Sequence, residues 1–438
     1  MRFINIIYSL ILMVILFVPS SCTKEYLNPN AATKTEVLKS PDGLMGLAVG
    51  IRREWSVGGT SALYSSIICN GLSTKELTVL NTGNAALAAL EAGKGSLNGA
   101  NGTMTSIWTS CNLTKAYAQQ LIDNANIIGD AGTRSGVEGY GLFFKALAIG
   151  TLCQFWEQIP TEVVSSSAYI DGKRPSFKAR TAAFDEAIAI LKQAEGIVKA
   201  NAPSATFNAK VGTDINLANA IQALIARFSL MNGKLDDAFA AAGAVSPTII
   251  SSFKFDAVNP NPVFRSGLVS NNVVGGIANF GLTGVLAPEA TDGRTPFYLG
   301  GTTLSKTTGF FKSDLDAIPL YLPSEMTLIR AEVLARQNKL TEAVTELNKI
   351  RTKATDPLSV TAKLAAYSGA SIQAAILEEI YKQRCIELYM SGLKLDDSRR
   401  FGRLGPLDTN FERNRNFYPY PTTERDNNQG NTPADPTI

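Results

Sequence analysis

Histidine is absent from the 438 residues of this chain. Serine and cysteine nucleophiles that depend on a histidine base are therefore excluded, and so are metal sites built on histidine ligands. Only five cysteines are present, and no two of them stand in a CxxC spacing. The sequence thus offers no basis for a zinc site, a thioredoxin-like site or a disulfide scaffold. Any catalysis would depend on carboxylates, lysine or tyrosine, and we expect no cofactor.

Charge is also scarce. Charged residues make up 18% of the chain, whereas about 25% is typical of globular proteins. The 41 basic and 38 acidic residues leave a formal net charge of +3, and they form no run of five like charges. A nucleic-acid-binding arm or a polybasic membrane patch would need such a run. We therefore expect no nucleic-acid partner.

The longest apolar run stands at the N-terminus, over residues 3–18, directly after Arg2. It is shorter than the roughly 20 residues that span a bilayer. It leads into the sequence PSSC, which ends at Cys22. A basic start, a short apolar segment and small residues before a break are typical of a secretory signal.

The cysteine directly after the small residues makes this segment resemble a bacterial lipoprotein signal. In such proteins the cysteine becomes the first mature residue and carries acyl chains. The resemblance implies a signal peptide over residues 1–21, lipidation at Cys22 and attachment to a membrane by the lipid anchor alone. The alternative is a simple cleaved signal in which Cys22 is incidental. Pro19 stands where such signals usually have an aliphatic residue.

Apolar residues at helical spacing predict several helices in the rest of the chain. The expected segments begin at Pro41 and cover residues 107–128, 141–158 and 181–200. Two further stretches, 216–242 and 324–353, predict a helix, a tight turn and a second helix. Residues 81–103 hold no aromatic side chain and are expected to form mostly loop, with a short helix at 85–92.

The two predicted turns align with each other. The sequence GKLDDA from Gly233 matches NKLTEA from Asn338. This unit resembles the helix-turn-helix of tetratricopeptide repeats. We therefore predict a mostly α fold, in which tetratricopeptide-like helix pairs at roughly 104–242 and 320–402 form a scaffold. Residues 245–319 are rich in Gly, Asn, Pro and Thr, and they predict an irregular, loop-rich subdomain with short strands.

Four motifs in the last third of the chain resemble the SusD/RagB-like outer-membrane lipoproteins. The sequence SEMTLIRAE from Ser324 resembles the EMxLIRAEA helix of that family, and LNKIR from Leu347 resembles its LNxIRxRA. The sequence DDSRRFG from Asp396 resembles DLRRWG, and YPYP from Tyr418 resembles the closing LPIP element. Residues 376–402 as a whole resemble the family helix that ends in DLRRWG. Earlier in the chain, Trp108 and residues 142–160 stand where the family has its first repeat pair, and TDGR from Thr291 resembles its DPR segment. The resemblance therefore covers nearly the whole mature chain in order, although QR at 383–384 and SG at 391–392 replace the family's ER and EG.

The resemblance implies one SusD-like domain over residues 22–438. Proteins of that family are binding proteins and not enzymes. They sit on the outer face of the outer membrane over a SusC-like TonB-dependent transporter, capture an oligosaccharide or a peptide, and deliver it to that transporter. For this chain we therefore expect a cell-surface, lipid-anchored location, that transporter as a partner, and a ligand site on the irregular subdomain.

Sugar binding needs flat apolar faces and planar hydrogen-bonding groups. Candidates outside the repeat helices are Trp55, Tyr64, Asn81, Phe280, Arg294, Phe297 and Tyr298. Phe297 and Tyr298 beside Arg294 are the strongest, because neighbouring glycines would leave their rings exposed. Each residue alone could instead be packed in the core. The lack of aromatic residues in 81–103 favours a small oligosaccharide or a peptide over a long polysaccharide.

Other conspicuous residues are better explained by structure. Arg330, Glu332 and Arg351 are expected to form ion pairs between helices rather than to contact a ligand. Trp108 and Trp156 are expected in the core. The acidic pairs around Asp314 and Asp396 lack the spacing of a calcium loop, so no metal site is predicted.

Two other functions remain open from the sequence. One is a surface glycoside hydrolase that uses two carboxylates, which turnover of a candidate glycan would reveal. The other is a helical-repeat scaffold that binds only proteins. A protein that co-purifies with a partner and binds no small ligand would favour the scaffold.

The lipid anchor yields the first testable prediction. Cys22→Ala removes the thiol that would carry the acyl chain, so most of the protein should leave the membrane fraction and become soluble. Ser21→Ala keeps a small residue before the cysteine and should stay membrane-bound. An unchanged membrane fraction for Cys22→Ala would reject lipidation at this residue.

Overall fold

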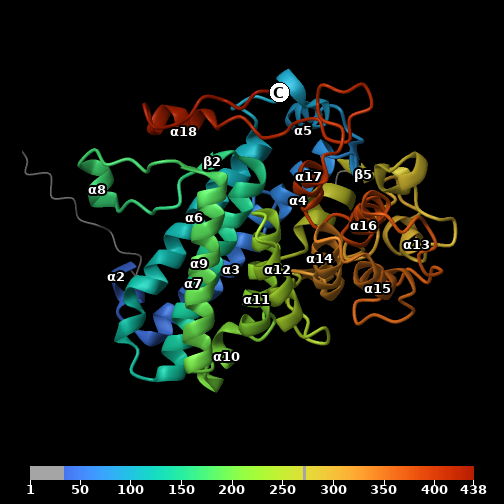
Figure 1. The fold of residues 1–438 in the computed structure, drawn as a ribbon. Coiled ribbons are helices and arrows are strands. Elements are labelled where there is room, and N and C mark those ends of the chain that lie inside the picture. Colours follow the sequence, from blue (N-terminus) through green and yellow to red (C-terminus); the bar gives the residue numbers. More distant parts are fainter. Residues whose placement is uncertain (1–33, 270–272) are drawn as a thin grey trace, which may run out of the picture.

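The computed structural model describes residues 34–269 and 273–438. The expected signal peptide and Cys22 therefore lie outside the described residues. The described chain is mostly helical, as the sequence predicts, and its strands are short and occur in pairs. Figure 1 shows long helices from the first half of the chain on one side and the shorter helices α13 to α17 on the other.

Six helices of the first half form the larger side of the molecule. They are α2 (Lys34–Leu38), α3 (Pro41–Ser56), α4 (Ala62–Ser73), α6 (Gly102–Asn124), α7 (Ala131–Phe155) and α9 (Arg180–Ala200). The helix expected from Pro41 begins there, because Ser40 caps it by accepting a hydrogen bond from the Gly43 amide at 3.0 Å. Asn101 and Asp130 cap α6 and α7 in the same way. The side chains at these caps thus decide where the helices start.

Smaller elements connect and flank these helices. They include α5 (Ala85–Ala92), which occupies the predicted residues, η1 (Lys94–Ser96), η2 (Ala125–Ile127), α8 (Ser166–Ile170) and α10 (Ala205–Val211). Strand β2 (Gln158–Ile159) pairs antiparallel with β3 (Lys178–Ala179). Helix α18 (Thr422–Asn427) lies in the C-terminal segment.

Both predicted helix pairs are present. The first consists of α11 (Leu217–Met231) and α12 (Leu235–Ala244), and the second of α14 (Pro323–Arg336) and α15 (Leu340–Arg351). The aligned turn positions, Gly233 and Asn338, both adopt a left-handed backbone with φ of 74° and 59°. Glycine adopts this conformation without a steric penalty, and asparagine tolerates it better than most residues. The two turns therefore have similar sequences because each needs a residue that tolerates the left-handed backbone. The tetratricopeptide assignment itself stays a prediction.

The single helix predicted over 376–402 is wrong. The chain forms α16 (Gln373–Glu387) and α17 (Lys394–Arg400), separated by a tight turn. In this turn Met390 and Gly392 have φ of 54° and 77°. The turn points its apolar side chains into the core, where Tyr389 and Leu393 are buried. Burial of this turn thus interrupts the continuous helix that the resemblance implies.

The segment between the two helix pairs has short elements, as expected. They are β4 (Ser252–Phe253), the π-helix η3 (Val263–Val269), β5 (Val274–Gly276), η4 (Ala278–Gly281), η5 (Gly284–Leu286), α13 (Arg294–Leu299) and β6 (Ile318–Pro319). Strand β5 pairs antiparallel with β1 (Leu77–Val79), with Gly276 opposite Leu77, and β4 pairs with β6. The β1–β5 pairing holds this irregular segment against the end of α4.

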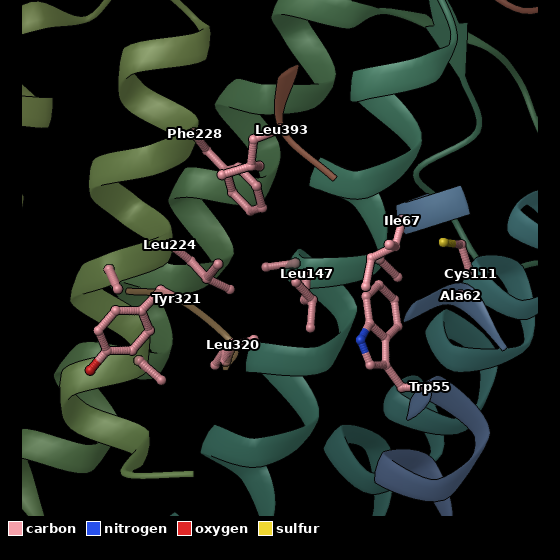
Figure 2. Close-up of a cluster of buried hydrophobic side chains, with 14 of the residues drawn as sticks. Trp55, Ala62, Ile67, Cys111, Leu147, Leu224, Phe228, Leu320, Tyr321 and Leu393 are labelled. Carbon is pink, nitrogen blue, oxygen red and sulfur yellow. The ribbon is translucent and has the colours of Figure 1, made fainter. Parts of the chain in front are cut away.

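The main hydrophobic core lies between these parts of the chain. Figure 2 shows Trp55 of α3, Leu147 of α7, Leu224 and Phe228 of α11, and Leu393 before α17 in one buried cluster. Gly150 permits the close approach of α7 and α11, since a Cβ atom there would lie 2.1 Å from the Phe228 ring. Replacing it with any larger residue would force the helices apart.

Trp108 and Trp156 are buried against each other with ring centroids 4.9 Å apart, so their expected place in the core is confirmed. Cys69, Cys111, Cys153 and Cys385 are likewise buried and free. A smaller core, which contains Leu347, lies among α14, α15 and α16. Of the helices described, not one combines the length and apolar character that crossing a bilayer requires.

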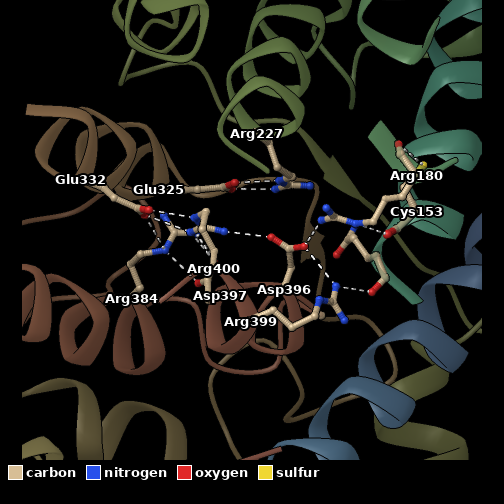
Figure 3. Close-up of polar contacts among 12 residues, drawn as sticks. Cys153, Arg180, Arg227, Glu325, Glu332, Arg384, Asp396, Asp397, Arg399 and Arg400 are labelled. Carbon is tan, nitrogen blue, oxygen red and sulfur yellow. Dashed lines mark hydrogen bonds and ion pairs between the residues drawn. The ribbon is translucent and has the colours of Figure 1, made fainter. Parts of the chain in front are cut away.

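Helix α17 brings buried charges to the junction of the two sides (Figure 3). The Asp396 carboxylate pairs with Arg180 of α9, with Arg399 at 3.1 Å and with Arg400 at 2.9 Å. Arg399 also donates a hydrogen bond to the Gln154 carbonyl of α7 at 2.6 Å. Asp396 is 1% exposed. A carboxylate can be buried so deeply because several guanidinium groups surround it.

Asp397 and Glu332 extend this network toward the other side. Asp397 accepts from Arg384 at 2.8 Å and 3.0 Å and from Arg400 at 2.7 Å. Glu332 of α14 pairs with Arg400 at 2.8 Å and with Arg336 at 2.9 Å. Arg400 therefore joins α17 to α14, and Arg384 joins α17 to α16. The expected structural role of Glu332 is confirmed.

Further ion pairs join neighbouring helices. Arg227 of α11 donates to Glu325 of α14 at 2.7 Å and 2.6 Å, which is a bidentate contact (Figure 3). Arg330 pairs with Glu346. Arg351 pairs with Glu289 and Glu379. Arg330 and Arg351 thus hold helices together, as the sequence predicts.

Glu332 should make stability depend on acidic pH. Its burial raises the pKa, but Arg400, Arg384 and Arg336 together lower it from 4.5 to about 2. A lowered folded-state pKa stabilises the protein above pH 4.5, and that stabilisation is lost as the pH falls toward 2. Glu332→Gln should cost about 3–5 kcal/mol of unfolding free energy at pH 7, and the difference from the parent should shrink between pH 4.5 and 2.

Urea denaturation at a series of pH values measures this difference. Glu342→Gln is the matched control, because Glu342 is exposed on α15 and its substitution should change stability little at any pH. A Glu332→Gln difference that stays constant down to pH 2 would contradict this role of the carboxylate.

Candidate functional site

The structure buries most of the residues that the sequence suggests for ligand contact. Trp55, Tyr64, Phe280, Arg294 and Tyr298 are each at most 6% exposed. These side chains are packed inside the protein, in agreement with the alternative that each belongs to the core. The expectation that Arg294 and Tyr298 stand exposed is therefore wrong. Of the remaining two candidates, Phe297 is half-buried and Asn81 is exposed. The seven residues do not gather around one hollow.

Arg294 is the clearest correction. It is fully buried on α13, where it donates to Asp292 at 2.9 Å and 2.7 Å, to Glu387 at 3.0 Å and to Gln383 at 2.6 Å. The Tyr298 hydroxyl donates to the Glu387 carbonyl at 2.9 Å. The glycine-rich surroundings suggest an exposed loop, but α16 covers this segment and satisfies its polar groups.

Phe280 and Tyr298 belong to the same packed group. Their ring centroids are 6.2 Å apart, and each ring also contacts Tyr389 edge-on, at 5.1 Å and 5.5 Å. Trp55 lies edge-on to Phe144 in the main core. These aromatic contacts stabilise the fold.

One hollow of the described surface is a groove of about 700 Å³ along α9, α11 and α12. Its floor is built largely from small residues, among them Ala218, Ala240 and Ala241, and its rim carries a Lys192–Asp237 ion pair at 3.0 Å. The described residues that line it include no aromatic side chain. The groove therefore lacks the flat ring on which a sugar would stack.

A second hollow, of about 500 Å³, is lined by an aromatic ring, that of Phe411. We name it the Phe411 cavity. Three segments form its walls: residues 74–75 at the end of α4, residues 281–286 around η5, and residues 403–404 and 410–412 of the loop after α17. Lys394 of α17 also lines it. The cavity thus combines part of the irregular segment, part of the N-terminal half and part of the last loop.

Phe411 is half-buried, and two ammonium groups lie over its ring. The Nζ atom of Lys75 is 3.9 Å from the ring centroid, and that of Lys94 is 5.0 Å away. Val285 and Leu404 of the cavity walls are 75% and 45% exposed. The cavity therefore presents apolar surface beside hydrogen-bond donors, which is the combination that ligand sites use.

Glu412 and Arg403 fix the outer wall. Their side chains pair at 2.7 Å, and the Tyr381 hydroxyl donates to Glu412 at 2.9 Å. Tyr381 belongs to α16, so these contacts attach the loop that carries Phe411 to a rigid helix. A wall held by three side chains keeps its shape without a ligand.

The inner wall contains buried charge. Lys394 is 4% exposed and donates to the Phe280 carbonyl at 3.0 Å. Glu76 lies beneath the cavity and is 1% exposed. Its burial raises the pKa of Glu76 to about 7, although Lys394 acts to lower it. A buried carboxyl beside a buried lysine makes this wall strongly polar.

The backbone around the cavity is strained. Lys75, Lys94, Asn279 and Phe280 have positive φ values of 60°, 47°, 56° and 59°. Such a conformation is uncommon for residues other than glycine, and it concentrates at ligand sites. Gly281 brings two walls together, since a Cβ atom there would lie 1.8 Å from the Lys75 carbonyl oxygen.

No signal in the sequence singles out Phe411, Lys75 or Lys94. They come from three distant segments and match no motif. The acidic pairs that could have suggested calcium are engaged elsewhere, because Asp396 and Asp397 pair with arginines and Asp314 pairs with Arg265. Within the described ranges, no group of histidine, cysteine, aspartate and glutamate side chains is suited to hold a metal ion.

Comparison with known proteins agrees with the resemblance found in the sequence. Residues 309–437 match the sequence model of the SusD family, which covers all four motifs noted above. A search of curated proteins finds no match. The family resemblance is thus supported independently by the last third of the chain and by the fold.

Several solved structures share the fold. A SusD superfamily protein from Bacteroides fragilis has a TM-score of 0.68 at 15% identity, with 89% of this chain and 98% of that chain covered. A SusD-like carbohydrate binding protein from Bacteroides vulgatus has a TM-score of 0.63 at 15% identity, covering 82% and 83%. A SusD-like carbohydrate binding protein from Bacteroides fragilis has a TM-score of 0.62 at 11% identity, covering 84% and 87%. At such identities the likeness establishes the fold.

Arg294 should prove structural. Arg294→Ala leaves the Asp292 carboxylate buried without its partner, while Glu387 keeps Lys353, and it should cost about 3–5 kcal/mol of unfolding free energy in urea denaturation. Arg265→Ala breaks the more exposed pair with Asp314 and should cost about 0–1 kcal/mol. If Arg294→Ala were as stable as the parent protein but no longer bound ligand, Arg294 would have to be interpreted as a ligand contact.

Proposed function

We propose that this chain, which has the SusD superfamily fold and the SusD family match over its last third, is a binding protein that captures an oligosaccharide. The two similar structures that are named carbohydrate binding proteins support a sugar as the ligand class. The protein would work at the cell surface and would not change its ligand chemically.

The Phe411 cavity is the observation that carries this proposal. It offers an aromatic ring, exposed apolar side chains and polar groups within one hollow of about 500 Å³. A sugar has an apolar C–H face and a rim of hydroxyls, so it needs a ring below it and hydrogen-bond partners beside it. Thr283 and Asn410, which are exposed, can supply those partners.

The cavity suits binding better than hydrolysis. Glycoside hydrolysis by the usual route requires two carboxyl groups that flank the scissile bond. Glu412 is the one acidic residue among the described residues that line the cavity. Its carboxylate is already engaged by Arg403 and Tyr381. The hydrolase alternative therefore has no second carboxylate here.

The resemblance supports three further parts of the proposal. The chain would be anchored to the outer face of the outer membrane through Cys22. It would work with a SusC-like TonB-dependent transporter and deliver the captured ligand to it. A peptide is the alternative ligand, since a ring beside hydrogen-bonding groups also suits an extended peptide.

Binding should depend on Phe411. A glycan array that contains neutral and acidic oligosaccharides identifies the ligand, and titration calorimetry then measures its Kd. Phe411→Ala should weaken binding about fivefold, because a stacked ring contributes about 1 kcal/mol. Its melting temperature should change little, since the ring is only half-buried.

Leu407→Ala is the matched control. Leu407 belongs to the same loop, is 82% exposed and does not line the cavity, so its substitution should leave affinity unchanged. Unchanged affinity of Phe411→Ala for the identified sugar would place the site elsewhere. Binding of peptides alone would favour the alternative ligand.

A further inference from the structure

We propose that the Phe411 cavity selects oligosaccharides that carry an anionic group, a carboxylate or a sulfate, over neutral ones. The inference rests on the proposed function, because it names the class of sugar that the same cavity takes. It is carried by the two lysines at the Phe411 ring.

The charges around the cavity do not balance. Lys75, Lys394 and Arg403 line it together with a single acid, Glu412. Arg403 already pairs with that acid at 2.7 Å. Lys394 is directed to the Phe280 carbonyl and has Glu76 beneath it. Lys75 therefore brings positive charge to the cavity that no wall residue neutralises by direct pairing.

Lys94 adds a second positive charge at the same ring. Within residues 34–269 and 273–438, neither Lys75 nor Lys94 forms an ion pair, and each ammonium group instead lies over Phe411. Burial lowers the pKa of Lys75, Glu412 raises it, and Lys394 and Lys94 lower it again. The lowered pKa agrees with a site where another negative charge would be favourable.

The fold holds both lysines in place by strained backbone. Lys75 and Lys94 have φ of 60° and 47°. The Lys94 amide donates to the Asn414 carbonyl at 3.0 Å, and Arg415 donates to the Lys94 carbonyl at 3.0 Å. The chain that carries Phe411 therefore also positions Lys94. Strain of this kind persists where the surrounding structure fixes it, and it is frequent at binding sites.

The position of the lysines over the ring discriminates between ligands. A sugar that stacks on a ring face covered by an ammonium group must displace that group. A neutral sugar then breaks a cation–π contact and offers the ammonium nothing equivalent. A carboxylate or sulfate beside the sugar ring offers the displaced ammonium an ion pair. Only the anionic ligand thus gains both the stacking and a charge partner.

The test compares three oligosaccharides of equal length on the full-length protein: a neutral one, one that carries a uronic acid and one that carries a sulfate. Calorimetry at 20 mM and 200 mM NaCl gives the Kd of each. At least one acidic ligand should bind about tenfold tighter than the neutral one at low salt, and this advantage should shrink at high salt. The tighter of the two acidic ligands identifies the preferred anion.

Three variants assign the preference to the lysines. Lys75→Gln combined with Lys94→Gln should reduce the acidic-to-neutral ratio to about twofold or less, without weakening the neutral ligand. Lys75→Arg combined with Lys94→Arg keeps both charges and should retain most of the preference. Lys192→Gln removes one charge from the other groove and should leave the ratio unchanged.

The outcomes separate this inference from the proposed function. Equal binding of neutral and acidic ligands that still depends on Phe411 would overturn the inference and keep the proposed function. A preference that survives in the double glutamine variant would overturn the assignment to Lys75 and Lys94. Binding of none of the oligosaccharides, by a protein with normal thermal unfolding, would overturn both.

Discussion

The buried ion pairs of α17 are the interaction on which the rest of the structure depends. Asp396 ties α17 to α9 through Arg180, and Arg400 ties it to α14 through Glu332. Charges buried this deeply are tolerated only when they are paired, and the observed arrangement of the two sides pairs these carboxylates with arginines from both. Hydrophobic contact alone is not directional and would define that arrangement less sharply.

The same helix positions the candidate site. Lys394 at its start lines the Phe411 cavity, and Arg399 near its end donates to the Asn416 carbonyl at 2.6 Å. Arg413 donates to the Ser398 carbonyl at 3.3 Å. The Arg403 amide donates to the same Ser398 carbonyl at 2.9 Å. The loop between Arg403 and Asn416, which carries Phe411, is therefore fastened to α17 at both ends. A loop held in this way can present a ring to a ligand on a rigid support, which limits the ordering that binding requires.

Charged side chains have different roles in the α17 network and at the Phe411 ring. In the α17 network, arginines and carboxylates neutralise one another, and planar guanidinium groups suit such bidentate buried contacts. At the Phe411 ring, the charges belong to lysines, which have flexible side chains and lack carboxylate partners within the described part of the chain. In the α17 network the charges are paired with one another and stabilise the fold. At the Phe411 ring, positive charge stays available at a surface hollow.

Much of the local structure can be predicted from the sequence, although the turn that separates α16 from α17 cannot. Capping residues, turn residues such as Gly233 and Asn338, and helical periodicity act over a few neighbouring positions, so they can be predicted from the chain. Which side chains are exposed depends instead on contacts between distant segments. Arg294 is buried because Gln383 and Glu387, 89 and 93 residues away, satisfy its guanidinium group, and Phe411 faces a cavity because distant segments meet around it. Burial depends on such long-range contacts, and the composition around a residue does not contain them.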